Sequence, residues 1–266
     1  MPSTTLSEAC IAECSAERGS SPVIELAEVS VRFRLPSERI ASFKEYILRR
    51  ITRRIEYRDL WALRSLDLTV RRGEIVGIIG RNGAGKSTLL KVMSRVLRPT
   101  SGRVIVRGRL APLLELGAGF QPDLTGRENV LLNATILGYP RASVRRRLEE
   151  VVEFAELPSF IDAPIRTYSS GMQARLGFAV ATLFRPEILL VDETLAVGDI
   201  GFQQKCLARI EEFKRDGTAV VLVSHSLDTI AQHCSKAIWL EDGCIAASGR
   251  TSDVLPEYES AVLPAK

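Results

Sequence analysis

No apolar run in this chain approaches the roughly 18–20 residues that a membrane-spanning helix needs. The first residues also lack the basic segment and apolar stretch that together mark a secretory signal, so we expect no secretion. Hydrophobic residues make up 45% and charged residues 26% of the 266 residues. These ordinary fractions favour one large globular core with room for a smaller lobe.

The cysteines are few and scattered. There are five, an odd number, which indicates free thiols in a reducing compartment rather than a disulfide framework. Cys10 and Cys14 have the spacing of half a metal site, but no matching Cys or His pair follows at zinc spacing. We therefore expect no zinc site.

The positive charge is concentrated in one part of the chain. Residues 32–72 carry 12 Lys and Arg against 5 Asp and Glu, a net charge of +7. The other residues therefore carry −3 of the overall +4. This asymmetry indicates a local electrostatic role rather than a generally basic protein.

The most specific motif is a phosphate-binding loop of the form G-x-x-x-x-G-K-[ST]. It consists of Gly80, Arg81, Asn82, Gly83, Ala84, Gly85, Lys86, Ser87 and Thr88. An apolar strand is predicted before it at 74–79 and a helix after it at 89–97, which is the context that the motif needs. These flanks argue against an incidental glycine turn.

This motif has a direct chemical use. Its glycines allow successive backbone N–H groups to face a phosphate, and the start of the following helix adds positive potential. Lys86 can reach the β- and γ-phosphates of a nucleotide, and the Ser87 hydroxyl can ligate Mg²⁺. A nucleotide with β- and γ-phosphates and Mg²⁺ are therefore the expected ligands, and the family resemblance given below implies ATP.

Hydrophobic patterning predicts an α/β chain. Apolar alternation or continuous apolar runs predict strands at 23–34, 61–70, 74–79, 102–108, 109–116, 188–193 and 219–225. Helical spacing predicts helices at 89–97, 127–137, 143–155 and 172–184. We expect residues 1–21 to form a disordered tail, 22–250 the main domain and 251–266 a C-terminal tail.

Residues 37–58 predict an amphipathic helix. Ile40, Phe43, Ile47, Ile51 and Ile55 share one face, and arginines cluster near the end. One interpretation is an ordinary helix with a solvated basic face. The other is a helix at a membrane interface, where each Lys or Arg contributes about 1 kcal/mol near anionic lipid and a protein partner fixes its position.

Three further segments carry polar groups where phosphate chemistry could use them. Tyr168 to Gly171 open a helix with hydroxyl groups, which fits either an anion site or a plain N-cap. Asp192 and Glu193 end a buried strand, where carboxylates are costly unless they meet Mg²⁺ or its water. His225 ends another strand and is either a satisfied polar residue or a donor to a γ-phosphate. His233 is expected to be structural or solvated.

Four motifs now follow one another along the chain: the loop at 80–88, the helix start at 168–172, the strand end at 189–193 and His225. With these motifs in this order, the chain resembles the nucleotide-binding subunit of an ABC transporter over roughly residues 23–250. The resemblance implies a P-loop NTPase with a parallel-sheet core, an antiparallel β subdomain and a helical subdomain inserted at 120–180. Three segments, 117–129, 168–172 and 195–199, look like the subfamily that exports O-antigen, capsular polysaccharide and teichoic acid. That subfamily also carries an amphipathic insertion like residues 37–58.

The resemblance implies a role for each matching residue. Glu193 would be the general base or the carboxylate that orients the attacking water, Asp192 would hold Mg²⁺ through water, and His225 would touch the γ-phosphate. Lys86 joins Glu193 and His225 as the third expected catalytic residue. Phe33 would stack on adenine, with Tyr57 and Trp61 as alternatives.

Other implied roles concern the second copy of the chain. Ser169, Ser170 and Gly171, which form the signature segment, would contact ATP bound to the opposite subunit. Asp199 would couple the two sites. In the family, a glutamine usually lies at the switch segment between the core and the helical lobe. Here Glu115 is nearest to that position, and Gln121 is the alternative.

These roles imply a homodimeric ATPase on the cytoplasmic face of the bacterial inner membrane, paired with two copies of a separate permease and touching the membrane through residues 37–58. A soluble ABC ATPase acting on nucleic acid or ribosomes is the alternative, suggested by the arginines of 49–58. The aromatic platform of a single-strand binder is missing there, so we expect no nucleic-acid partner. A non-catalytic, ATP-gated module is disfavoured by Glu193 and His225.

Overall fold

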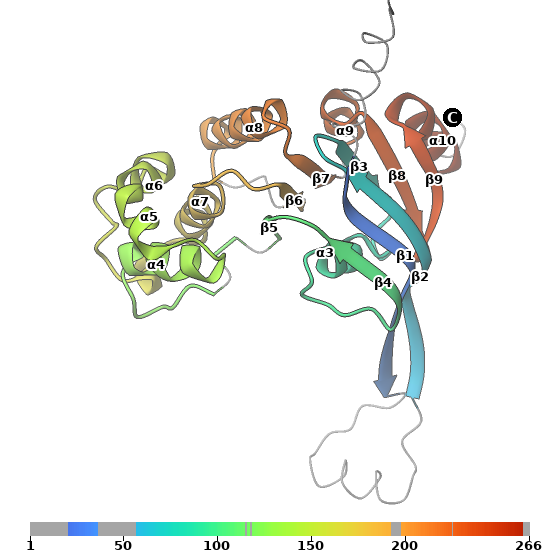
Figure 1. Ribbon diagram of the computed structural model, residues 1–266, viewed down its shortest axis with the longest axis horizontal. Coiled ribbons are helices and arrows are strands. Elements are labelled where there is room, and N and C mark those ends of the chain that lie inside the picture. The colour runs from blue at the N-terminus through green and yellow to red at the C-terminus, as the bar shows by residue number, and fades with distance from the viewer. Residues whose placement is uncertain are drawn as a thin grey trace, which may run out of the picture.

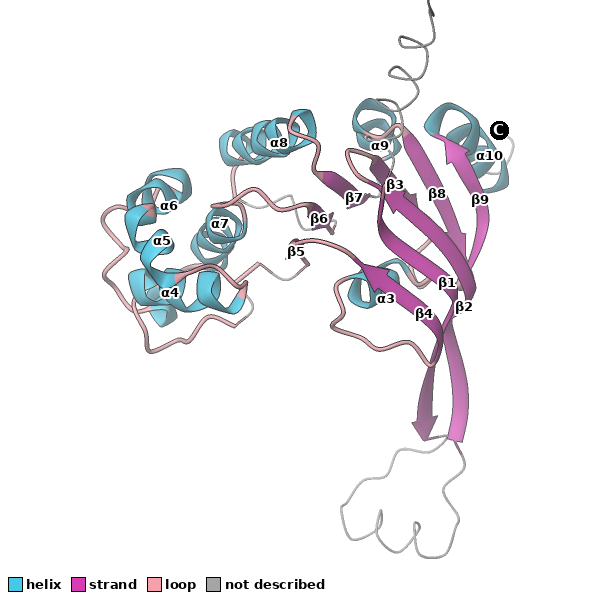
Figure 2. Ribbon diagram, in the orientation of Figure 1, coloured by secondary structure: helices cyan, strands magenta, loops and turns pink. Residues whose placement is uncertain are grey.

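The computed structural model describes residues 21–36, 57–114, 116–117, 119–192, 198–224 and 226–262. Figure 1 shows its elements in chain order, and Figure 2 shows helices and strands separately. Within these residues, no helix has the length and apolarity that crossing a bilayer requires. The amphipathic segment 37–56 and the tail 1–20 lie outside the described residues, as do Glu115, Glu193 and His225.

The larger sheet is six-stranded, in the order β5-β6-β7-β3-β8-β9. All neighbouring strands are parallel except β8 and β9, which form an antiparallel pair. Its strands are β3 (Ile75–Ile79), β5 (Leu110–Leu113), β6 (Ile188–Val191), β7 (Ala219–Val223), β8 (Lys236–Glu241) and β9 (Cys244–Arg250). The inner strands β3, β6 and β7 are buried throughout, as their continuous apolar sequences predict.

The smaller sheet is antiparallel, in the order β2-β1-β4. It contains β1 (Pro22–Pro36), β2 (Tyr57–Arg71) and β4 (Ser101–Val106). In Figure 1, β1 and β2 run on together as a long ribbon beyond the end of β4. Tyr57 and Arg58 belong to this ribbon, paired with Pro36 and Leu35, so the predicted helix 37–58 is wrong at its last two residues.

Helices cover the larger sheet on both faces. They are α3 (Lys86–Met93), α8 (Ile200–Arg215), α9 (Leu227–His233) and α10 (Thr251–Val262). Val76 and Ile78 of β3 join a core shared with α3 and the smaller sheet, whereas Ile75 and Ile79 join a core shared with α8 and α9. The period of two along β3 therefore separates two hydrophobic cores.

A separate helical lobe follows β5. It contains α4 (Gly126–Ile136), α5 (Arg141–Arg146), α6 (Leu148–Ala155), the 3-10 helix Ile165–Thr167 and α7 (Ser170–Ala181). Its own core includes Tyr139, whose ring stacks on Phe184 at 4.3 Å. Figure 2 shows this lobe as an all-helical group beside the strands. The arrangement agrees with the predicted parallel core, antiparallel subdomain and helical insertion.

Several predicted elements have different bounds in the structure, and two of these differences change how the chain packs. The predicted helix 143–155 is interrupted at Arg147, whose φ of −111° and ψ of 13° leave the helical range. The Arg147 guanidinium donates to Glu150 and lies 4.9 Å from the centre of the Phe184 ring. After residue 250, where we expect a tail, α10 packs on the sheet through an edge contact between Tyr258 and Trp239.

Candidate functional site

The phosphate-binding loop joins β3 to α3 by a path that only glycine can follow at its two ends. Gly80 and Gly85 have φ of 150° and 105°, in the range that favours glycine. A Cβ atom on Gly80 would overlap the carbonyl oxygen of Leu240, and one on Gly85 would lie 2.5 Å from the carbonyl oxygen of Ala62. Gly85 is also the N-cap of α3, so the loop delivers the start of that helix to the site.

Lys86 is buried although it carries a charge. Its Nζ donates to the carbonyl oxygens of Gly80 at 2.7 Å and of Arg81 at 3.1 Å. These bonds fold the side chain back across the loop and help to offset the cost of burying an ammonium group. An anion cradled by the loop would therefore meet a cation already in place.

A cleft of about 330 Å³ opens beside the loop. Its lining includes six loop residues, the ends of β6 and β7, and an apolar wall from β1 and β2. The lining residues are Phe33, Leu60, Trp61, Ala62, Asn82, Gly83, Gly85, Lys86, Ser87, Thr88, Asp192 and Val223. Gly80, Arg81 and Ala84 complete the loop without lining the cleft.

The apolar wall contains two of the three aromatic residues that the sequence suggests for adenine. Phe33 and Trp61 line the cleft, whereas Tyr57, near the outer end of β2, does not. The Arg32 guanidinium lies over the Trp61 ring, 5.4 Å from its centre. Sequence reasoning missed Leu60 and Ala62, which flank Trp61 in β2 and line the cleft with it.

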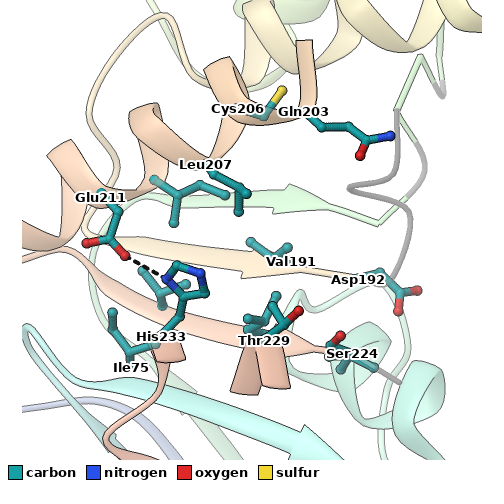
Figure 3. A pocket seen from close by; sticks show the side chains of 14 residues that line it. Ile75, Val191, Asp192, Gln203, Cys206, Leu207, Glu211, Ser224, Thr229 and His233 are labelled. Carbon is teal, nitrogen blue, oxygen red and sulfur yellow. Dashed lines mark hydrogen bonds and ion pairs between the residues drawn. The ribbon is translucent and has the colours of Figure 1, made fainter. Parts of the chain in front are cut away.

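The strand ends meet at this cleft as predicted for parallel strands. Asp192 follows β6 and Ser224 follows β7, and Figure 3 shows both side chains at the same end of these neighbouring strands. Asp192 also borders a second cavity of about 220 Å³ between the sheet and α8. Glu193 and His225 come next in the chain, outside the described residues.

The second cavity is mainly apolar and holds the other histidine at its far end. His233 is the last residue of α9, and its Nδ1 lies 3.0 Å from Oε1 of Glu211 on α8. Figure 3 shows this pair well away from Asp192. His233 therefore has the structural role expected for it, although it ends the helix rather than lying inside it.

The signature segment lies on the helical lobe. Ser169 is the N-cap of α7, and its Oγ accepts a hydrogen bond from the Met172 N–H at 3.2 Å. Ser169 and Ser170 are exposed, Gly171 is half-buried, and none of the three is among the residues that line the loop's cleft. In Figure 1, α7 and α3 lie in different parts of the molecule. The signature segment and the phosphate-binding loop of one chain therefore do not form a single site.

Asp199 caps α8 and is bonded to the signature helix. Its Oδ1 accepts from the Phe202 N–H at 2.9 Å, and its Oδ2 pairs with Arg175 of α7 at 2.6 Å. The Phe202 N–H and the Arg175 guanidinium hold the pKa of the Asp199 carboxyl below its usual range. Arg175 also binds Glu156 at 3.2 Å. Sequence reasoning missed Arg175, because its spacing gives no hint of these partners.

Gln121, one alternative for the switch, is exposed, and neither cavity described above includes it in its lining. Its backbone N–H donates to the buried Asn129 side chain at 2.7 Å, and its carbonyl accepts from the same side chain at 3.1 Å. Asn129 thus fixes the entry to the helical lobe. Glu115, the other alternative, is outside the described residues.

The cleft contains oxygen atoms that could serve as ligands of a hard divalent cation. Ser87 and Asp192 both line it beside Lys86. Across the described residues, no group of three or more His, Cys, Asp or Glu could hold an ion alone. Mg²⁺ usually takes one or two protein oxygens and completes its shell with water and substrate phosphates, so this pair of donors suits it.

Comparisons with known proteins agree with this geometry. The chain matches the ABC transporter family over residues 63–196. It is 43% identical over 243 residues to an O-antigen export system ATP-binding protein of Klebsiella pneumoniae, covering 91% of this chain and 99% of that protein. It is 48% identical over 248 residues to an O-antigen export system ATP-binding protein of Myxococcus xanthus, covering 91% of this chain but 57% of that one.

Solved structures share the fold. A dimeric ATP-binding cassette in a post-hydrolysis state, bound to ADP and phosphate, aligns with a TM-score of 0.68 at 24% identity, over 86% of this chain and 98% of that one. The ATP-binding subunit of an ABC transporter aligns with a TM-score of 0.70 at 24% identity, over 89% and 93% of the two chains.

Proposed function

The chain belongs to the ABC transporter family, and from that premise we propose that it is the ATP-hydrolysing subunit of a bacterial exporter. Its cargo would be a lipid-linked polysaccharide such as an O-antigen, capsular or teichoic-type glycan, moved across the inner membrane by a separate permease. The observation that carries this proposal is the match to the Klebsiella export protein along almost the whole of both chains. The alternative, action on nucleic acid or ribosomes, has no such support.

ATP would occupy the cleft beside the loop. The loop N–H groups and Lys86 would hold the phosphates, and the aromatic ring of Phe33 would stack on adenine. Ser87 and Asp192 would hold Mg²⁺, which supplies charge neutralisation at the phosphate oxygens when bound. The buried Lys86 ammonium supports this proposal because it faces the same cleft as both oxygen donors.

Hydrolysis would use the residues that follow the strand ends. Glu193 would orient the attacking water or accept its proton, and His225 would contact the γ-phosphate. The position of Asp192 supports this assignment, because it brings the end of β6 to the phosphate cleft. Asp199 would couple this site to its counterpart in a second copy.

The signature segment would complete the site of a second copy. Ser169, Ser170 and Gly171 lie at the start of α7, where the helix end carries positive potential, and none of them lines the cleft of their own chain. A homodimer would bring this helix start to the γ-phosphate held by the partner subunit. ATP would then favour the closed dimer, and hydrolysis would remove that preference.

Contact with the membrane would be peripheral. We assign it to two permease copies and to residues 37–58, on the cytoplasmic face of the inner membrane. The β1–β2 ribbon supports this assignment, because Pro36 and Tyr57, the described residues on either side of 37–56, are paired at its end.

The Glu193→Gln variant tests both hydrolysis and export. We expect it to keep ATP binding but hydrolyse about 10²–10⁴-fold more slowly, since this is the usual loss with a general base. Glu187→Gln, the same change just before the opposite end of β6, is the control. Hydrolysis is measured with the co-expressed permease, and export as surface glycan restored to a deletion strain. Full turnover by E193Q would refute the assignment of Glu193, and unchanged surface glycan after deletion would refute export.

A further inference from the structure

A tight turn far along the chain touches the phosphate-binding loop. It joins β8 to β9 at Asp242 and Gly243, whose φ values are 45° and 80°. Positive φ at both central residues is typical of a two-residue hairpin turn of type I′, for which Asp-Gly is a favoured sequence. The sequence thus explains the turn itself, but not what the turn touches.

Both backbone groups of Gly243 are engaged with other elements. Its N–H donates to the carbonyl oxygen of Ala84 in the loop at 3.1 Å. Its own carbonyl accepts from the Arg64 N–H on β2 at 2.8 Å. One residue therefore links the phosphate-binding loop to the strand that carries Leu60 and Trp61, two residues of the apolar wall of the cleft.

The same junction has no room for a side chain. A Cβ atom on Gly243 would lie 2.7 Å from the carbonyl oxygen of Ala62 and 3.2 Å from the Cα of Leu63. The same carbonyl oxygen of Ala62 lies close to Gly85, and the carbonyl oxygen of Leu240 lies close to Gly80. The backbones of the β8–β9 turn, the phosphate-binding loop and β2 are thus in direct contact. A larger residue at position 243 would have to displace one of them.

We propose that Gly243 is a positioning residue that holds the phosphate-binding loop in register with β2. This inference rests on the proposed binding of nucleotide in the cleft. Gly243 does not itself line the cleft, and it acts through the Ala84 carbonyl and the β2 backbone. The phosphate-facing N–H groups of the loop keep their spacing from the apolar wall only while this bridge is intact.

The test compares Gly243→Ala with Gly217→Ala. Gly217 has a φ of 82°, nearly that of Gly243, but a Cβ atom there would meet nothing within 4 Å. Alanine therefore suffers the same unfavourable backbone conformation at both positions, and only G243A adds the clash. We expect G243A to weaken ATP and ADP binding by about tenfold or more, since shifted donors lose hydrogen bonds to the phosphates. G217A should bind as the wild type does.

Titration calorimetry of the full chain with nucleotide and Mg²⁺ gives these affinities, and thermal melting reports stability in parallel. Equal affinity of G243A and wild type, or equal loss in both variants, would overturn the inference. If the wild type binds no nucleotide, the proposed function fails before this inference is reached.

Hydrogen exchange on the wild type covers the case in which G243A does not fold. The Gly243 amide is bonded to the loop, whereas the Gly217 amide is bonded to Lys214 at 2.9 Å, away from the cleft. We expect nucleotide to slow exchange at Gly243 and leave Gly217 unchanged. Loop amides that slow without any change at Gly243 would contradict the bridge.

Discussion

The side chains of Arg175 and Asp199 each make contacts that join α7 to α8. Arg175 lies 5.1 Å from the centre of the Phe202 ring while its guanidinium binds Asp199 and Glu156. Asp199 in turn caps α8. The start of α8 is therefore fixed to α7, the helix that carries the signature segment. Movement of one of these two helices is expected to carry the other.

Asp199→Asn tests the charged part of this contact. Asparagine also caps helices well, so the change removes the charge and keeps the cap. Because the pKa of Asp199 is depressed in the folded chain, its ionised form adds stability above the ordinary Asp pKa of about 3.9. That stability is lost as the pH falls through the lower folded value.

The melting temperature of the wild type should therefore be slightly higher than that of D199N at pH 7. This gap in melting temperature should close as the pH falls below about 4. The expected gap is small because the Asp199 side chain is 67% exposed. Thermal melts from pH 7 to pH 3 measure it. A gap that stays constant over this range would show that the charge of Asp199 has no part in it.

At the scale of elements, the start of α7 has two roles that mutation can separate. The Ser169 hydroxyl caps its own helix and, by our proposal, also faces the ATP of a second copy. Ser169→Ala should cost about 1 kcal/mol of stability, the usual effect of losing a serine cap. In a Glu193→Gln background, it should also weaken dimerisation driven by ATP and Mg²⁺.

Thr125→Ala is the matched control for this change. Thr125 caps α4 by accepting from the Glu128 N–H at 3.2 Å, in the same lobe but outside the signature segment. It should lose similar stability while dimerising normally. Sedimentation measures dimerisation and urea unfolding measures stability. Equal weakening of the dimer by both variants would mean that Ser169 acts only as a cap.

The elements also show where local sequence suffices. The loop and its flanking strand and helix follow from residues 74–97, because the glycines, Lys86 and the apolar run are local signals. The interruption at Arg147 could not be predicted, since it accompanies a contact with Phe184, 37 positions along the chain. The Gly243 bridge escaped prediction for the same reason, because its partners Ala84 and Arg64 lie far away in the sequence.

For the whole molecule, local patterning predicted β3, β6, β7 and the helical lobe but not α8, α9, β8 or β9, and the three-part architecture followed from the resemblance to ABC transporters. The period of two in β3 separates the two cores of the larger sheet, and helical spacing marks the lobe. The motifs predicted Lys86, Ser87 and Asp192 and the resemblance implied Phe33, and these four residues do line one cleft. Its apolar wall of Leu60 and Ala62 depends on the pairing of β1 with β2, which no local pattern specifies.

In the proposed mechanism, two copies of this chain enclose ATP between the loop of one and the signature segment of the other. Sedimentation of Glu193→Gln tests it most directly, because slow hydrolysis preserves the bound state. We expect a dimer with ATP and Mg²⁺, and a monomer with ADP or when Lys86→Ala is added. A mass that is the same with and without ATP, in a sample shown to bind it, would show that the chain does not pair around nucleotide.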